Sequence, residues 1–269
     1  MSLLKMINFQ NRTAALACVC ALSFSTMASF PVAADQKTDD LLRHFESVVF
    51  GSEIDGVEGA DYIQKWMSPV RVSMTSMQGK MLTGPGGKRE LKLSFVPPDK
   101  AYVALVRKHL TTLVKVTGAK SEKSDEAKGK PANFMIKFVP RLAMGQPFLA
   151  DDVDPAILNK LAQPGVCYFL TRSVSTGAMF RALIVVNNEL PPAQMDACLL
   201  EEMTQAMGLP NDSDIISPSI FNQNSTAQSL SNSDLLLLKT LYDIRLPAGT
   251  PKVDAMRIGR EILIEHLGG

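Results

Sequence analysis

The side chains best suited to chemistry lie together in one short segment. Glu201 and Gln205 are four residues apart, so on a helix they share one face. Asn211 and Asp212 follow shortly after Gly208, a residue that commonly ends a helix. All four polar side chains offer oxygen, which suits calcium or magnesium better than zinc, but the set has few charges for a tight site. These residues therefore predict no bound cofactor, with a weak calcium or magnesium site as the alternative.

The same segment resembles the motif helix of zinc endopeptidases, whose pattern is H-E-x-x-H-x-x-G-x-x-H. The three histidine positions of that pattern are occupied by Glu201, Gln205 and Asn211. Glu202 stands at the general-base position, and Gly208 stands at the glycine that turns the chain. Zinc prefers imidazole, thiolate and carboxylate ligands, and a neutral amide is a poor substitute. The resemblance implies the outline of a metalloprotease without its metal site.

A second segment resembles the end of a metzincin domain, where a tight turn places a methionine beneath the metal. The turn corresponds to residues 217–222, and Phe221 occupies the methionine position. Residues 230–234 and 241–243 match the closing helix of the type L-[ST]-x-x-D…L-Y. Because the two segments follow in the right order, the chain resembles degenerate zincin-like domains of exported proteobacterial proteins of unknown function. The resemblance implies fold more directly than activity.

The implied fold class is α+β and zincin-like: a mixed twisted sheet with a long backing helix, a motif helix and a closing C-terminal helix. Apolar spacing predicts the backing helix from Pro98 and Asp99 to Gly118. A first helix, capped by Thr38 or Asp39, runs to about Phe50. The remaining helices are the motif helix, from the prolines at 191–192 to about 207, and the closing helix over 235–242.

Alternating apolar residues predict the strands, which zincins arrange with an edge strand beside the cleft. The expected strands cover residues 66–74, 91–96, 133–138, 167–174 and 181–187. The glycine-proline cluster at 84–87 is expected to be a turn, since neither a lysine-serine pair nor a helix start follows it as in a phosphate-binding loop. The last two strands form a pair joined by the turn at 175–177, and one of them is the candidate edge strand.

Residues 1–34 have the features of a secretory signal peptide, and residues 35–269 are expected to form a single domain. Lys5 and Arg12 precede a largely apolar stretch, and Val32-Ala33-Ala34 is a small-residue cleavage site. A retained membrane anchor is the competing interpretation, but serines interrupt the stretch and no positive flank follows it. Lipidation of Cys18 is less favoured, since this residue lies inside the apolar run. We therefore expect a periplasmic or secreted protein with no stable membrane span after cleavage.

Two cysteines remain outside the expected leader, Cys167 and Cys198. An exported protein with two cysteines is expected to oxidise them, so these two are predicted to form a disulfide. A pair of buried free thiols or of zinc ligands is the alternative, although no C-x-x-C spacing or nearby histidine supports a zinc site.

The composition excludes an electrostatic nucleic-acid binder, because the formal net charge of the chain is only +1 at pH 7. The function expected from the resemblance is a non-catalytic one: a peptide or cell-envelope protein binds in the former protease cleft. Glu202 is then a packing and hydrogen-bonding residue. The alternative is an active peptidase or other hydrolase with an unusual metal site or with Glu202 as a catalytic residue. None of His44, His109 and His266 lies near the motif in sequence.

Overall fold

One mixed sheet organises the part of the chain that the computed structural model describes, residues 30–52 and 57–268. The strand order is β1-β6-β4-β2-β3, and β5 also pairs with β6. Neighbours are parallel except at the β2–β3 and β5–β6 pairs, which are antiparallel. The strands are β1 (Lys65–Trp66), β2 (Val72–Thr83), β3 (Arg89–Val96), β4 (Phe134–Val139), β5 (Cys167–Ser173) and β6 (Ala178–Asn187). The expected α+β class with a mixed sheet is confirmed.

The two central strands are apolar on both faces because both faces are covered. In β6, Ile184 and Val186 point into one core cluster, while Leu183 and Val185 point into another. Phe138 of β4 belongs to the first cluster. A strand buried on both sides reads as a continuous apolar run rather than as an alternating one, which explains the sequence of β6.

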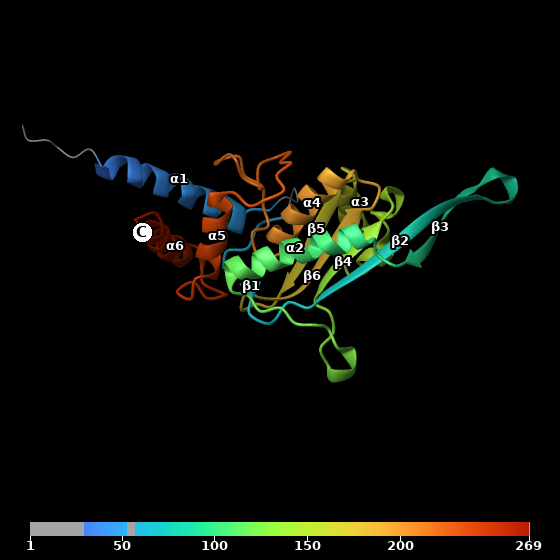
Figure 1. Cartoon of the computed structure of the whole chain (residues 1–269), viewed down its shortest axis with the longest axis horizontal. Helices are drawn as coiled ribbons and strands as arrows, with labels where there is room; N and C mark the ends of the chain where they lie inside the picture. Colours follow the sequence, from blue (N-terminus) through green and yellow to red (C-terminus); the bar gives the residue numbers. More distant parts are fainter. Residues whose placement is uncertain (1–29, 53–56, 269) are drawn as a thin grey trace, which may run out of the picture.

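Helices cover the sheet, and further helices lie beyond one end of it (Figure 1). The helices are α1 (Phe30–Phe50), α2 (Lys100–Thr117), α3 (Pro155–Ala162), α4 (Pro192–Gln205), α5 (Asn232–Tyr242) and α6 (Lys252–Gly268). Helices α2 and α4 pack against each other on the first core cluster, and α3 contributes to the second. Helices α1, α5 and α6 gather at one end of the molecule, and the β2–β3 hairpin projects from the other.

The long helix α2 confirms the backing helix predicted from sequence. The Asp99 carboxylate accepts a hydrogen bond from the Ala101 amide at 2.7 Å, which caps the first turn. Gly118 ends the helix with a φ of 68°, and its N–H donates to the Val114 carbonyl. Val106 and Leu113, on its inner face, are buried as the apolar spacing requires.

Short 3-10 turns connect several of these elements. They cover Pro85–Gly87, Glu126–Lys128, Arg141–Ala143 and Pro147–Leu149. The first of them lies at the tip of the β2–β3 hairpin, so the expected turn at 84–87 is confirmed. The last two lie in the connection between β4 and α3, which the sequence patterns did not resolve.

Several boundaries differ from the sequence-based expectations. The single strand expected at 66–74 is wrong: it splits into β1 and β2 around Pro69, which has no N–H to donate to a sheet. Helix α1 starts at Phe30 rather than at Thr38 or Asp39, and two alanines favour helix in the added segment. Helices α3 and α6 were not predicted.

None of the helices in the described ranges is long and apolar enough to cross a membrane. Most of the expected signal peptide, with Cys18, lies outside the described residues; its last five residues form the start of α1.

Candidate functional site

Helix α4 presents the motif residues from a largely buried position. It begins with Pro192 at its first turn, where proline costs no hydrogen bond. Glu202 is 7% exposed and Gln205 is 2% exposed, while Glu201 is half-buried on the same side as Gln205. Polar side chains buried to this degree need partners within the protein. The motif residues are therefore parts of the packed interior as much as of a surface cleft.

Gly208 turns the chain at the end of α4 through a conformation that other residues rarely adopt. Its φ is 111°, and a Cβ placed there would lie 2.3 Å from the Gln64 carbonyl oxygen. Two neighbouring carbonyls are fixed from other elements: the Trp66 indole donates to the Ala206 carbonyl at 2.9 Å, and the Tyr242 hydroxyl donates to the Met207 carbonyl at 2.8 Å. The glycine of the motif thus has a steric and conformational reason to be glycine.

The structure brings Asp212, not Asn211, to the motif face of α4. The Gln205 amide donates to the Asp212 carboxylate at 3.1 Å. The Asn211 amide instead donates to the Ser47 carbonyl of α1 at 3.0 Å and to the Asp212 carbonyl at 2.8 Å. Of the residues at the histidine positions, Glu201 and Gln205 share a face and Asn211 is turned toward α1.

Glu201 is electrostatically perturbed in this arrangement. Burial, and next the negative charge of Asp212, raise the pKa of the Glu201 carboxyl from 4.5 to about 8. At neutral pH this side chain is therefore mostly a neutral acid that can donate a hydrogen bond. Among the residues that the structure describes, no group of three or more histidine, cysteine, aspartate or glutamate side chains could hold a metal ion.

Phe221 lies in a network that fixes the turn after the motif. Its ring is fully buried and packs edge-on against the His44 ring, with 6.2 Å between the two ring centroids. The Ser219 hydroxyl donates to the Asp234 carboxylate at 2.6 Å, and that carboxylate also accepts from the Ile220 amide at 3.2 Å. Asp234 therefore anchors the turn to the start of α5, as well as forming a capping box with Ser231.

His44, Ser219 and Asp234 meet in this network although sequence distance gave no reason to expect it. The His44 ring nitrogens lie 3.1 Å from the Ser213 hydroxyl and 3.5 Å from the Ser219 hydroxyl. Burial lowers the pKa of His44, and the Asp234 charge offsets this in part. His44 and Asp234 have no exposed surface and Ser219 is 3% exposed. The cluster is a packed structural network, not an accessible nucleophile site.

Lys65 is a second buried polar residue that the sequence patterns did not single out. Its ammonium donates to the carbonyls of Leu241 at 2.9 Å and Asp243 at 3.4 Å, at the end of α5, and lies over the Tyr242 ring. Burial lowers the pKa of Lys65 to about 8, against the opposite effect of Asp243. Its hydrogen bonds to the last carbonyls of a helix give it a structural role.

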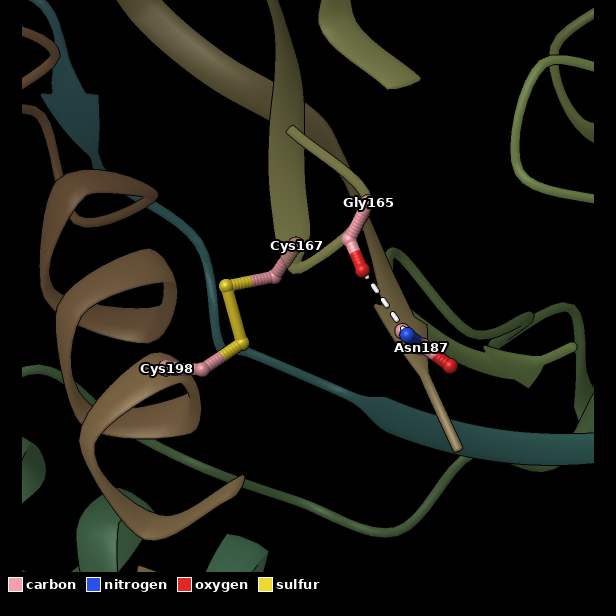
Figure 2. Close-up of a disulfide and its surroundings, with 4 residues drawn as sticks. All are labelled: Gly165, Cys167, Asn187 and Cys198. Atoms are coloured by element: carbon pink, nitrogen blue, oxygen red, sulfur yellow. Dashed lines mark hydrogen bonds between the residues drawn. A yellow bond between two sulfur atoms is a disulfide. The ribbon is translucent and has the colours of Figure 1, made fainter. Parts of the chain in front are cut away.

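The predicted disulfide between Cys167 and Cys198 is confirmed, with a Cα–Cα distance of 6.3 Å. It joins the first residue of β5 to α4 three residues before Glu201 (Figure 2). Beside it, the side-chain amide of Asn187 donates to the Gly165 carbonyl at 2.8 Å and fixes the turn that precedes β5. The disulfide therefore sets the distance between the edge strand and the motif helix.

Two cavities lie along β5 where it faces the motif. The first, of about 270 Å³, is lined by β5 residues 168–172 and, from the end of α4 onward, by Gln205, Gly208 and Pro210. The second, of about 620 Å³, lies at the other end of the strand, beside the disulfide, Glu201 and the loop 224–228. Although Glu201 and Gln205 are one turn apart, they line different cavities.

The pairing of β5 leaves alternate backbone groups directed away from the sheet. The backbone N–H of Asn187 donates to the Val166 carbonyl, so these two opposed residues form a hydrogen-bonded pair of the antiparallel ladder. Counting along the antiparallel register, Tyr168 and Leu170 also bond to β6, and the N–H and C=O groups of Phe169 and Thr171 point outward. No backbone partner for the outward Phe169 amide occurs in the described part of the chain. The outward Thr171 carbonyl accepts a hydrogen bond from the Arg172 guanidinium at 3.1 Å. A strand edge with outward backbone groups can pair with another strand.

Comparison with known proteins yields one match. No curated protein and no solved structure matches the chain. Residues 38–260, which include every motif residue, the two disulfide cysteines and the His44 network, match the family described as "Protein of unknown function (DUF2927)". Since the match covers most of its length, the chain belongs to the DUF2927 family.

Proposed function

We propose that this protein is an exported zincin-like domain that has lost zinc catalysis and binds an extended peptide, or an extended segment of a cell-envelope protein, along β5. The carrying observation is that β5 is an antiparallel edge strand with outward-facing backbone groups, set beside the motif helix and its cavities. A strand in this position can recognise a peptide by adding it to the sheet, and this needs no metal.

The arrangement of elements supports the zincin-like assignment. The backing helix α2 packs beside α4 on the sheet, α4 ends in a glycine turn, and a tight turn then leads to the closing helix α5. This is the chain order that the zincin resemblance implies. Phe221, at the methionine position of the resemblance, has a fully buried ring in the same core cluster as α4.

The chemistry of the motif supports a non-catalytic cleft. The Gln205 amide is engaged by Asp212, and Asn211 is engaged by α1. A general base in a zincin acts on a water molecule whose pKa the metal has lowered to about 7, so Glu202 alone has little reactive water to activate. Export is supported by the disulfide, since such bonds persist in oxidising compartments.

A hydrolase is the second candidate, and one observation favours it. A carboxyl whose pKa is raised to about 8 inside a cavity, as for Glu201, is a typical general acid. Chelator-insensitive peptide cleavage that disappears in both Glu201→Gln and Glu202→Gln, with folding retained, would establish this candidate instead.

The proposal is tested by binding of extended peptides to the purified protein. A library of unstructured peptides is screened, and the best binder is titrated into Phe169→Pro and Phe169→Ala variants. Proline removes the outward N–H and alanine keeps it, so the comparison isolates the backbone hydrogen bond. We expect a loss of about tenfold in affinity from proline beyond the effect of alanine.

Hydrogen exchange provides a readout that does not depend on the variants. Peptide binding should slow exchange of the Phe169 and Thr171 amides, and should leave the amides of Tyr168 and Leu170, already bonded to β6, unchanged. If no peptide binds, or if the bound peptide protects a region remote from β5, the proposed function is wrong.

A further inference from the structure

We propose that the projecting β2–β3 hairpin, residues 78–94, is a membrane-docking arm that embeds its tip in a bilayer surface rich in anionic phospholipid. This segment is called the arm below. It concerns a different surface from the β5 cleft and does not depend on the proposed peptide binding.

The arm leaves the body of the protein beyond the point where β2 pairs with β4. The β2–β4 pairing ends at Ser76, whereas the β2–β3 pairing continues to Thr83. The outer part of the hairpin is thus a two-stranded ribbon that extends away from the sheet (Figure 1). Every residue from 78 to 90 is exposed. An isolated two-stranded ribbon is marginally stable in water, so its length requires a reason.

Charge on the arm is strongly one-sided. It carries Lys80, Lys88, Arg89 and Lys92 against the single acidic residue Glu90, within a chain of net charge +1. None of these four basic residues forms a salt bridge in the described structure. Lys80 and Lys92 are directly opposed across the ribbon, an arrangement of like charges that destabilises the ribbon unless an anion lies nearby.

Two exposed apolar side chains lie close to the same tip. Met81 is 45% exposed and Leu82 is 37% exposed. Because neighbouring residues of a strand point to opposite faces, Leu82 lies on the face of Lys80 and Lys92, and Met81 lies on the face of Arg89. The tip therefore has both apolar and basic groups on both faces.

This two-sided distribution favours a bilayer over a folded protein as the partner. A protein surface that adds to the ribbon covers one face or one edge and leaves the other face in water. A bilayer interface that receives the arm tip-first surrounds it, so Met81 and Leu82 both enter the acyl boundary and the basic groups on either face meet lipid phosphates.

The test is co-sedimentation of the protein, as expressed and processed by a bacterial host, with vesicles. One set of vesicles contains phosphatidylglycerol and the other contains only phosphatidylcholine. We expect binding to the first set alone, and its loss at about 0.5 M salt, where the screening length falls to about 4 Å. A basic residue near an anionic surface contributes about fivefold in affinity, so replacing all four with glutamine should weaken binding by roughly a hundredfold or more.

A matched control removes the same charge elsewhere. Lys100, Arg107, Lys115 and Lys123 are exposed and form no salt bridge in the described structure, and their replacement by glutamine should leave binding within about twofold. A second arm variant, Met81→Ser with Leu82→Ser, keeps the charge and should weaken binding several-fold. Circular dichroism verifies that each variant is folded.

Three results would overturn the proposal. They are an absence of vesicle binding, equal binding by the arm and control variants, and binding of the arm to an acidic soluble protein without binding to either vesicle set.

Discussion

The buried carboxyl of Glu201 makes the stability of the protein depend on pH, which could not be predicted from its position in the motif. Its pKa in the folded protein is raised to about 8 from 4.5, first by burial and then by Asp212. The folded state therefore holds a proton that the unfolded state releases between these two pH values. This contributes stability that is fully present below pH 4.5 and is lost as the pH rises through about 8.

We predict that Glu201→Gln removes this loss, because the amide stays neutral. The free energy of unfolding of the unmodified protein should fall, relative to that of the variant, by up to about 1.4 kcal/mol per pH unit across this window. Urea unfolding at several pH values measures the difference. Glu126→Gln, at an exposed position in the 3-10 turn Glu126–Lys128, is the control and should follow the unmodified protein. Parallel curves for Glu201→Gln and the unmodified protein would contradict the prediction.

The residue-level content of the site was only partly predictable from sequence. Motif spacing placed Glu201 and Gln205 on one face correctly, because the helical repeat fixes that relation. It pointed to Asn211 as the third position, whereas Asp212 is the residue that contacts Gln205. After a glycine at φ 111° the direction of the next side chains depends on backbone angles and on the Ser47 carbonyl of α1, neither of which spacing encodes.

At the level of elements, local signals succeeded where local physics decides the structure. Helix α2 follows its cap at Asp99 and its stop at Gly118, both of which act within one turn. The length of β2 was missed, because a ribbon that continues beyond the sheet is set by its pairing with β3. The His44 network was missed since it joins residues from α1, a turn and α5.

Asp234 should be the main element-level anchor of the turn that contains Phe221. Its buried carboxylate accepts from the Ser219 hydroxyl and from the Ile220 and Ser231 amides. Asp234→Asn replaces one oxygen with an NH2 group that faces a donor, so we expect a loss of about 2 to 4 kcal/mol in the free energy of unfolding. Denaturant titration measures it.

The neighbouring Ser233→Ala variant is the control for Asp234→Asn. Ser233 is half-buried at the first turn of α5, where its hydroxyl lies 2.8 Å from the Ser231 hydroxyl, and its replacement should cost about 1 kcal/mol or less. A loss of equal size in both variants would show that the cap of α5, rather than the anchored turn, determines the effect.

The disulfide should stabilise the folded protein and also hold β5 in place against α4. It closes a loop of 31 residues, for which the chain-entropy relation gives about 3 to 4 kcal/mol. We predict that Cys167→Ser with Cys198→Ser lowers the free energy of unfolding by about that amount. Relative to the unmodified protein, hydrogen exchange should accelerate more in β5 than in β4, because the disulfide ties only β5 directly to α4. Uniform acceleration across the sheet would contradict this local role.

For the whole molecule, the two proposed surfaces lie at opposite edges of one sheet. Strand β5 is bonded to β6 at one edge, and β3, with the arm, forms the other. Because the arm would enter the bilayer tip-first and β5 lies in the body of the protein, docking through the arm leaves the β5 edge outside the bilayer. The fold therefore permits peptide binding while the protein is held at a membrane, and neither function requires the other.

The last prediction tests the zincin-like fold through its metal geometry. In the unmodified protein we expect much less than one equivalent of zinc, because Glu201, Gln205 and Asn211 occupy the three imidazole positions. Glu201→His with Gln205→His would place two imidazoles one turn apart on α4, with Asp212 beside the second. This double variant should bind about one equivalent of zinc, measured by metal analysis after dialysis.

A third substitution in the zinc-binding variant distinguishes the two candidate third ligands. Adding Asp212→Asn should abolish zinc binding, whereas adding Asn211→Ala should not, because Asn211 is bonded to Ser47 and turned away from the motif face. If the double variant binds no zinc although it is folded, or if Asn211 proves to be the required ligand, then α4 and the segment after it do not form the metal-site geometry of a zincin.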